Sequence, residues 1–229
     1  MSSTWTPIQH THLTDQVYAA VRDRILSRLI KIDEQVNVEE IAAELRVSRT
    51  PVVDAIKRLA AEGLVEVKAR RGTYVRGISE HDLIEIFQIR EALELFALRH
   101  AIESDVHDQV VKEMSTLLQA MGDSIDGDTF SDYSRFTMAD RAFHTVMIDS
   151  CDNQRMKDSY ENLNIHLHIM RSHFFEGLEP PKRVHADHTE ILEALIARDY
   201  ASAEKVVRNH LSSIRTKMID NIRKAGGML

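Results

Sequence analysis

Cysteine is almost missing from this chain: Cys151 is the only one among 229 residues. A disulfide within the chain is therefore excluded, and so are the Cys-x-x-Cys pairs of zinc ribbons and redox sites. No stretch approaches the roughly 18 consecutive apolar residues that a membrane helix needs. The first residues, MSSTWTPIQHTH, lack the basic region and apolar run of a signal peptide. These absences predict a cytoplasmic protein without a membrane partner.

Motifs of common catalytic sites are missing as well. The sequence contains no His-Glu-x-x-His run, no glycine-rich phosphate loop and no nucleophile motif. We therefore expect a protein that is not an enzyme. Its 43% hydrophobic and 28% charged residues are typical of a globular protein, and its length suits two domains.

Charge is distributed unevenly along the chain. The formal net charge of −7 argues against a protein that coats nucleic acid without specificity. Residues 1–77 nevertheless carry 12 lysines and arginines against 10 acidic residues, and from Arg46 to Arg76 the balance is 8 basic to 3 acidic. A basic stretch in an otherwise acidic protein indicates one surface dedicated to DNA.

Apolar spacing predicts three helices in the first 77 residues. The first has an apolar residue at every fourth position, which is typical of an amphipathic helix: Leu13, Val17, Val21, Ile25 and Leu29. A second, short helix is expected to begin after Asn37, with Glu40 completing a start that resembles a capping box. Ser48 is expected to cap a third helix, which Gly63 ends.

A hairpin is predicted to follow the third helix. Leu64–Val67 and Thr73–Val75 have the composition of short strands, and Arg70, Arg71 and the turn residue Gly72 lie between them. Two short helices joined by a tight turn, followed by a hairpin with a basic tip, predict a winged helix-turn-helix whose third helix enters the major groove of DNA. The alternative is a winged helix that is used only for protein contacts.

The segment VSRTPVVDAIKRLAAEGLVEVKARRGTYV, from Val47 to Val75, resembles the winged helix of the GntR family of regulators. The resemblance implies that Arg49 contacts bases or phosphates, that Ser48 and Thr50 hold phosphates, and that Arg70 or Arg71 reaches the minor groove. Phosphate contacts position a protein on DNA, and base contacts give specificity. Including the basic residues of the third helix, the expected DNA-binding set is Ser48, Arg49, Thr50, Lys57, Arg58, Arg70 and Arg71.

Two departures from the family pattern affect specificity. Val53 stands where the family often has an arginine, so one base-reading contact is missing. Ile32 and Asp33 replace the usual Pro-Gly turn before the second helix. For these reasons the operator sequence cannot be copied from relatives.

After Gly77 the pattern changes to long helical periods with almost no strand signal, and its breaks leave room for six helices. The expected fold class is therefore mainly α, with a winged helix-turn-helix DNA-binding domain and its small hairpin in residues 1–77, and an all-α antiparallel bundle in residues 78–229. Polar residues fall on the apolar faces of three predicted helices in the second domain. They are Asp140 and His144 within 131–150, His188 after Pro181, and His210 in the last helix.

A buried carboxylate is costly unless it is paired or coordinated, and three inward imidazoles add to that cost. One divalent metal ion would satisfy Asp140, His144, His188 and His210 together. Asp-x-x-x-His places two ligands on one face of a helix, and the donor set suits zinc first, with nickel, manganese or iron as alternatives. The other possibility is that each histidine is a separately hydrogen-bonded core residue.

This second domain resembles the FCD ligand-binding domain of the FadR subfamily of GntR regulators. The matching segments, in order, are IREALE, DRAFH, DHTEILEAL and NHL. The resemblance implies that one aspartate and three histidines bind a metal and leave coordination positions for a small carboxylate. Arg90 is expected to bind that carboxylate, although Glu94, one turn away, could pair with it instead. Solvated or outer positions are expected for His166, His168 and His173.

Together these patterns predict a ligand-responsive DNA-binding regulator of metabolic genes, in the first place a repressor. Two copies would bind a palindromic double-stranded operator as a homodimer, through the helical domain as effector-binding and dimerisation domain. A small carboxylate effector, bound at or near the metal, would change the affinity for DNA. Two other functions stay open: a regulator with a purely structural metal and no effector, and a metal-dependent hydrolase, which the missing catalytic motifs disfavour.

Overall fold

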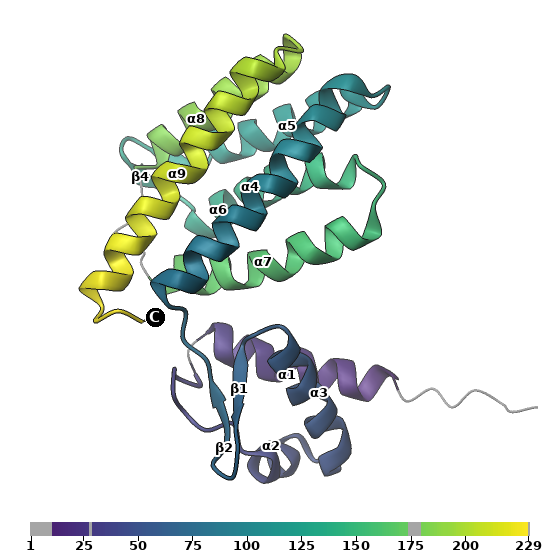
Figure 1. The fold of residues 1–229 in the computed structure, drawn as a ribbon, viewed down its shortest axis with the longest axis vertical. Coiled ribbons are helices and arrows are strands. Elements are labelled where there is room, and N and C mark those ends of the chain that lie inside the picture. The colour runs from purple at the N-terminus through teal and green to yellow at the C-terminus, as the bar shows by residue number, and fades with distance from the viewer. Residues whose placement is uncertain (1–10, 28, 174–179, 229) are drawn as a thin grey trace, which may run out of the picture. The chain divides into compact units, whose positions relative to one another are not determined.

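The computed structural model describes residues 11–27, 29–173 and 180–228, which divide after Gly77 into two compact units (Figure 1). The described residues form nine helices and two hairpins, and the mainly α fold class predicted from the sequence is confirmed. The N-terminal unit contains α1 (Thr11–Leu26), α2 (Val38–Leu45), α3 (Arg49–Ala61), β1 (Val65–Lys68) and β2 (Gly72–Val75). The helical unit contains α4 (Glu80–Glu103), α5 (His107–Gly122), β3 (Ile125–Asp126), β4 (Thr129–Phe130), α6 (Tyr133–Asp149), α7 (Gln154–His173), α8 (Pro181–Ile196) and α9 (Tyr200–Lys224).

The core of the N-terminal unit lies where α1 packs on α3. Val17, Val21 and Ile25 are buried, as their spacing predicts. The two ends of the predicted apolar stripe are different, because Leu13 is 44% exposed and Leu29 is 68% exposed. Helix α1 ends at Leu26, so Leu29 no longer follows the helical period that the sequence pattern assumed.

The helices α2 and α3 begin differently, because only α2 has a side-chain cap. The side chain of Asn37 accepts hydrogen bonds from the backbone N–H groups of Glu39 and Glu40, as an N-cap does. Ser48 occupies the N-cap position of α3, but its side chain makes no capping hydrogen bond, in contrast to the prediction. Asp33 adopts a φ of 60°, the left-handed conformation that a glycine would supply without strain.

The wing is a tight antiparallel hairpin in which Val65 pairs with Val75 and Lys68 with Gly72. Its tip is held by two hydrogen bonds to backbone carbonyl groups, from Arg71 N–H to Lys68 and from the Tyr74 hydroxyl to Arg71. Gly72 has a φ of 115°, and a Cβ atom there would lie 2.6 Å from Nε2 of Gln35. Glycine is therefore required where the second strand begins, directly after the two arginines of the tip.

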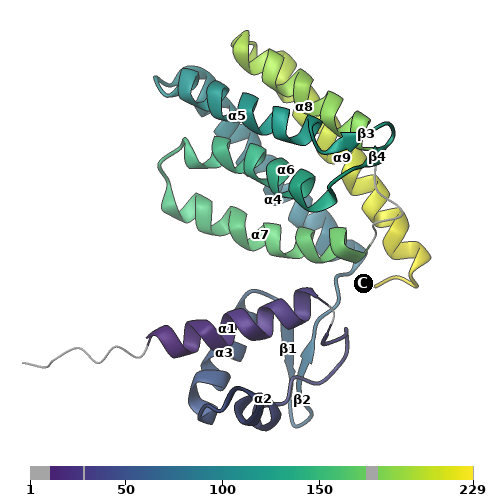
Figure 2. The ribbon, with the colours of Figure 1, turned by 180° about the vertical axis from the view of Figure 1, so that it is seen from behind.

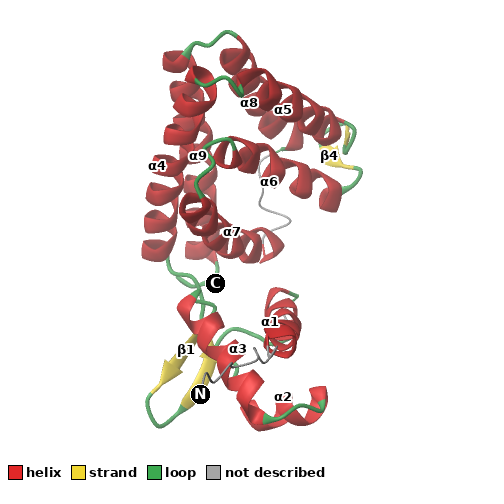
Figure 3. Ribbon diagram, turned by 90° about the vertical axis from the view of Figure 1, so that its right-hand side faces the viewer, coloured by secondary structure: helices red, strands yellow, loops and turns green. Residues whose placement is uncertain are grey.

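In the helical unit, α4 and α9 lie side by side (Figures 1 and 2), and α5 packs on α6 and α8. Figure 3 shows α4 and β4 on opposite sides of this unit. A capping box starts α4, because Ser79 and Asp82 each bind the backbone N–H of the other residue. The polar residues that the sequence pattern singled out lie on the buried faces of α4, α6, α8 and α9.

Two smaller features complete the description. The short hairpin β3–β4 was not predicted, and it rests on an aromatic cluster in which the ring of Phe130 lies 5.1 Å from that of Tyr133 and 4.9 Å from that of Phe136. Asn153 caps the start of α7 by accepting a hydrogen bond from the backbone N–H of Met156. Of the helices in the described part of the chain, none is both long and apolar enough to cross a membrane.

We expect Leu59→Ala to lower the free energy of unfolding of the N-terminal unit by about 2–5 kcal/mol, because truncating a fully buried side chain leaves a cavity. Leu45, which is 39% exposed, provides a matched control, and Leu45→Ala should cost much less. Urea unfolding followed by circular dichroism measures both. Equal losses would contradict the packing described for α3.

Candidate metal centre

Three helices bring four of the predicted residues together inside the helical unit. Helix α6 carries Asp140 and His144 one turn apart, α8 carries His188, and α9 carries His210. All four are at most 2% exposed. The stripe pattern of each helix accounts for this burial, because each polar residue lies among apolar residues of the same face.

The side chains converge on one point. The Nε2 atoms of His144 and His188 are 3.2 Å apart, and Oδ1 of Asp140 lies 3.2 Å from Nε2 of His188. One ring nitrogen from each of His144, His188 and His210 lies within 4.8 Å of the others. This spacing is close to that of donor atoms around a single ion.

Acceptors on the outer side orient the imidazoles of His188 and His210. His188 Nδ1 lies 2.6 Å from the carbonyl oxygen of Val184, and His210 Nδ1 lies 3.2 Å from Oδ2 of Asp187. His144 Nδ1 lies 3.0 Å from Oε2 of Glu94, within ion-pair distance, but neither atom makes a hydrogen bond in the described part of the structure. With acceptors at the Nδ1 atoms of His188 and His210, a neutral ring keeps its proton on Nδ1 and directs the Nε2 lone pair inward.

Electrostatics favour the neutral form of these rings. Burial lowers the pKa of His210 to about 3, and it also lowers the pKa of His144. The hydrogen bond with His210 lowers the pKa of Asp187, which therefore stays a carboxylate. Neutral imidazoles and carboxylates are the forms in which these side chains bind metals.

The residues present fit a divalent metal ion. Nε2 of His210 is buried without a hydrogen-bond partner in the described part of the structure. Nε2 atoms of His144 and His188 would direct lone pairs at each other across 3.2 Å unless a cation or a proton lies between them. A shared cation would give all three Nε2 atoms a common partner.

A buried ion pair lies beside the cluster. Arg90 is 2% exposed and Glu94 is fully buried, and Nε of Arg90 donates to Oε1 of Glu94 at 2.5 Å. The hydroxyl of Tyr160, on α7, donates to the same oxygen at 2.7 Å. Although burial alone would raise the pKa of Glu94, the charge of Arg90 beside it holds that pKa well below its usual value. Arg90 thus pairs with Glu94, the alternative that the sequence left open, but its Nη1 is buried without a hydrogen-bond partner in the described residues.

The predicted DNA-binding residues are exposed on the N-terminal unit. The side chains of Arg49 and Lys57 are 70% and 71% exposed. Each makes an exposed ion pair, Arg49 with Glu39 and Lys57 with Asp54, and such pairs are weak enough to exchange for phosphate. Ser48, Thr50, Arg70 and Arg71 are also exposed.

Arg58 has a different environment. Its guanidinium lies 3.8 Å from the centre of the Tyr18 ring and pairs with Asp15 and Glu62, which ties α3 to α1. Tyr18 in turn donates to Glu62 at 2.6 Å. DNA contact by Arg58 stays a prediction, and it would require Arg58 to give up these contacts.

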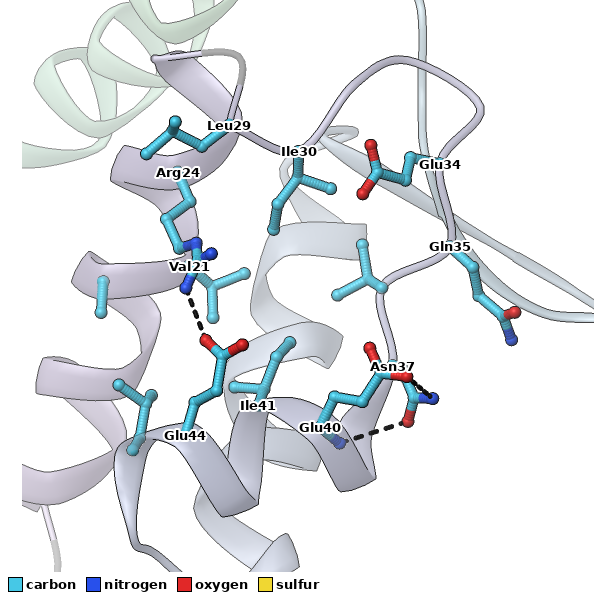
Figure 4. A pocket seen from close by; sticks show the side chains of 13 residues that line it. Val21, Arg24, Leu29, Ile30, Glu34, Gln35, Asn37, Glu40, Ile41 and Glu44 are labelled. Carbon is cyan, nitrogen blue, oxygen red and sulfur yellow. Dashed lines mark hydrogen bonds and ion pairs between the residues drawn. The ribbon is translucent and has the colours of Figure 1, made fainter.

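A pocket of the N-terminal unit lies between α1, the loop after it and α2 (Figure 4). Three carboxylates line it together with one arginine, and each carboxylate already has a partner. The pairs are Glu44 with Arg24 at 2.6 Å, Glu34 with the backbone N–H of Lys31 at 2.9 Å, and Glu40 with Asn37 at 3.0 Å. This pocket is therefore unsuited to an anionic ligand, unlike the surroundings of Arg90.

Sequence reasoning did not find Tyr160 or Asp187, which hold Glu94 and His210. Asp187 directly precedes His188 in the sequence, and this adjacency was the one available signal. His185 lies outside the cluster, with Nε2 3.2 Å from the carbonyl oxygen of Leu118. The side chains of His166, His168 and His173 lie outside the described residues.

Each of the two units matches a known protein family. Residues 13–75 match the family "Bacterial regulatory proteins, gntR family", and residues 85–213 match the FCD domain. The gluconate operon transcriptional repressor of Bacillus subtilis is 29% identical over 205 residues, which cover 87% of this chain and 82% of that protein. The repressor RspR of Escherichia coli is 28% identical over 202 residues, with 88% and 87% covered.

Two solved structures share the fold. The Escherichia coli protein McbR/YncC has a TM-score of 0.72 at 20% identity, covering 92% of this chain and 99% of its own. A GntR transcriptional regulator from Rhodococcus sp. RHA1 has a TM-score of 0.71 at 19% identity, with the same coverage. At this level of identity the likeness extends to the fold.

A winged helix with a basic tip, joined in one chain to a helical bundle, defines a DNA-binding transcription regulator. The chain belongs to the GntR family of bacterial regulatory proteins, in the group that carries an FCD domain, as its sequence motifs predicted. The matched families and the relatives named above are regulators and not enzymes.

We expect Glu94→Gln to lower the free energy of unfolding of the helical unit by about 3–5 kcal/mol, because it leaves the buried charge of Arg90 uncompensated. Glu91→Gln is the matched control one turn away, since Glu91 pairs with Arg208 at the surface. Urea unfolding of chelator-treated protein compares the two variants. If both lose the same small amount, the buried pair does not stabilise the fold as described.

Proposed function

We propose that this protein is a repressor that releases its operator when a small carboxylate binds beside a metal ion in the helical unit. The observation that carries the proposal is the convergence of three buried imidazoles, with Asp140 3.2 Å from one of them, next to an arginine whose buried Nη1 no described residue uses. A regulator that acts on bacterial operators works in the cytoplasm. We therefore place it there.

Asp140, His144, His188 and His210 would hold the divalent metal, with zinc as the first candidate and nickel, manganese or iron as alternatives. Val184 and Asp187 hold the imidazoles of His188 and His210 from outside, and Glu94 lies within ion-pair distance of His144, which keeps the donor atoms in place. When bound, the metal supplies open coordination positions that attract an anionic oxygen ligand.

Arg90 is the residue that we assign to the effector carboxylate. Its charge lowers the pKa values of His144 and His210, in addition to the larger effect of burial, so it acts on the same small volume as the proposed ligands. A guanidinium with a free N–H group can bind a carboxylate by a charge-assisted hydrogen bond. The Bacillus subtilis relative is named for a gluconate operon, and gluconate is a hydroxy acid of the class that such a site would accept.

The DNA-binding surface would consist of the start of α3 and the wing. Arg49 and Lys57 project from α3, while Arg70 and Arg71 form the wing tip, and Ser48 and Thr50 lie where the backbone of α3 begins. A helix N-terminus with hydroxyl side chains suits phosphate groups, and arginines suit guanine edges or the minor groove. Two such units in a homodimer would bind a palindromic operator.

We expect about one metal ion per chain in the purified protein, and none in the variant Asp140→Ala/His144→Ala, because the variant lacks two of the four donor side chains. His185→Ala is the matched control, since His185 lies outside the cluster and should leave the metal content unchanged. Elemental mass spectrometry measures the content, and chelator treatment of the unmodified protein tests the same point without any substitution. Absence of metal even after reconstitution would contradict the proposal.

The effector part of the proposal is measured with the same samples. A panel of small carboxylates is tested for release of operator DNA and for a rise in Tm, in metal-loaded and metal-stripped protein. A response that requires the metal supports a sensor. A protein that unfolds on stripping and responds to none of the acids has a structural metal instead.

We expect Arg49→Ala and Arg71→Ala each to weaken operator binding at least about tenfold, and each lost phosphate contact to lower the salt dependence by about one unit of slope. Arg155→Ala, an exposed arginine of the helical unit, is the control and should bind operator normally. Fluorescence anisotropy at several salt concentrations measures this. Unchanged binding in both variants would place the DNA-binding surface elsewhere.

A further inference from the structure

The outer face of α4 carries a row of exposed side chains, whose two charged ends contact other residues of the described helical unit: Glu85 lies 3.3 Å from His81, and Arg99 lies over the ring of Tyr200. Ile89 is 50% exposed and Phe96 is 61% exposed, although both are large and apolar. Glu85, Ala92 and Arg99 are exposed as well. Figure 1 shows α4 on the near side of this unit, with no other described element in front of it.

These residues form one straight seam. The positions of Glu85, Ile89, Ala92, Phe96 and Arg99 alternate by four and three residues, which is the spacing by which a helix packs along another helix. The opposite face of α4 is the buried one and holds Arg90 and Glu94. A single exposed apolar residue needs no explanation, but an apolar pair at a seven-residue spacing with a small residue between them indicates a packing surface.

We infer that the outer face of α4 is the centre of the homodimer interface, where two copies of α4 cross antiparallel at Ala92. This inference rests on the homodimer proposed above and adds the surface that forms it. Around a two-fold axis at Ala92, Glu85 lies seven residues before the axis and Arg99 seven residues after it. Glu85 of one subunit therefore meets Arg99 of the other, and Ile89 meets Phe96.

Charge selects this register over its alternatives. A parallel arrangement would place Glu85 against Glu85, and a shift of the axis by two residues would place Glu85 against Glu103. Like charges opposite each other are unfavourable, whereas the register centred on Ala92 makes two opposite-charge pairs and two apolar contacts by symmetry. The small side chain of Ala92 at the crossing point allows the two helices to approach closely.

A stable dimer buries about 800 Å² per partner, which is more than one helix face supplies. The neighbouring surface of α9 is available for the rest, since α9 lies beside α4. Where α4 and α9 meet, Glu91 and Arg208 pair, and Arg99 lies 4.1 Å from the centre of the Tyr200 ring. An apolar centre with charged residues around it has the composition of a dimer interface.

Charge reversal tests the pairing in the full-length protein. We expect Glu85→Arg and Arg99→Glu each to raise the Kd for dimerisation at least about tenfold, and the double variant to return it close to the original value. Sedimentation velocity over a range of concentrations measures the Kd. Circular dichroism confirms that each exposed substitution leaves the fold intact.

Cross-linking tests the position of the axis. In a Cys151→Ser background, Ala92→Cys should form a disulfide-linked dimer on mild oxidation, because the two copies of that residue meet at the axis. Glu103→Cys, on the same helix and also exposed, is the matched control and should stay monomeric on a non-reducing gel.

The outcomes distinguish a wrong interface surface from a protein that forms no homodimer. A dimer that does not cross-link at position 92 and tolerates Glu85→Arg overturns this surface but leaves the homodimer intact. A chain that sediments as a monomer and still binds a single operator half-site overturns the homodimer as well. Cross-linking at position 92 together with rescue in the double variant supports both.

Discussion

A buried carboxylate needs neighbours that compensate for its lost hydration, and the neighbours of Glu94 come from three helices. It pairs with Arg90 on α4, accepts a hydrogen bond from the hydroxyl group of Tyr160 on α7 and lies 3.0 Å from Nδ1 of His144 on α6. The helical unit can bury this charge only if all three groups keep their positions. The surroundings of the His144 ring, and with them the shape of the histidine cluster, thus depend on the buried ion pair between Arg90 and Glu94.

The N-terminal unit differs from the helical unit in where its charged side chains lie. Its cations remain at the surface, where Arg49 and Lys57 pair with acidic neighbours that water also reaches. Exposed pairs contribute little to stability and exchange readily, so these arginines and lysines can take phosphate partners at little cost. With a net charge of −7, the protein would bind DNA through this proposed patch alone, and repulsion from the rest of the chain would oppose non-specific binding.

The sequence predicted the fold class and the family because both depend on local patterns. Period and caps give the helices, and the inward placement of His188 and His210 follows from the stripes on which they lie. The partners of these residues were not predictable in the same way. Tyr160 meets Glu94 across a crossing of two helices, and helix crossings are set by packing of the whole unit.

The errors have equally specific causes. Leu29 continued the apolar spacing of α1 but lies beyond the end of the helix, where periodicity has no meaning. DNA contact by Arg58 stays a prediction, but its neighbour Tyr18 was not predictable, because neither composition nor spacing reveals that contact. The hairpin β3–β4 was missed because two residues per strand give no recognisable alternation.

Helix α4 places Arg90 on its inner face directly after Ile89 on its outer face. A rigid helix cannot move one of these residues and leave the other behind. If a ligand draws Arg90 by a fraction of a helical turn, the seam on the far side rotates by the same angle, with no flexible loop in between to absorb it. Because α4 is one rigid helix, a displacement of Arg90 inside the bundle would also displace the exposed face that carries Ile89.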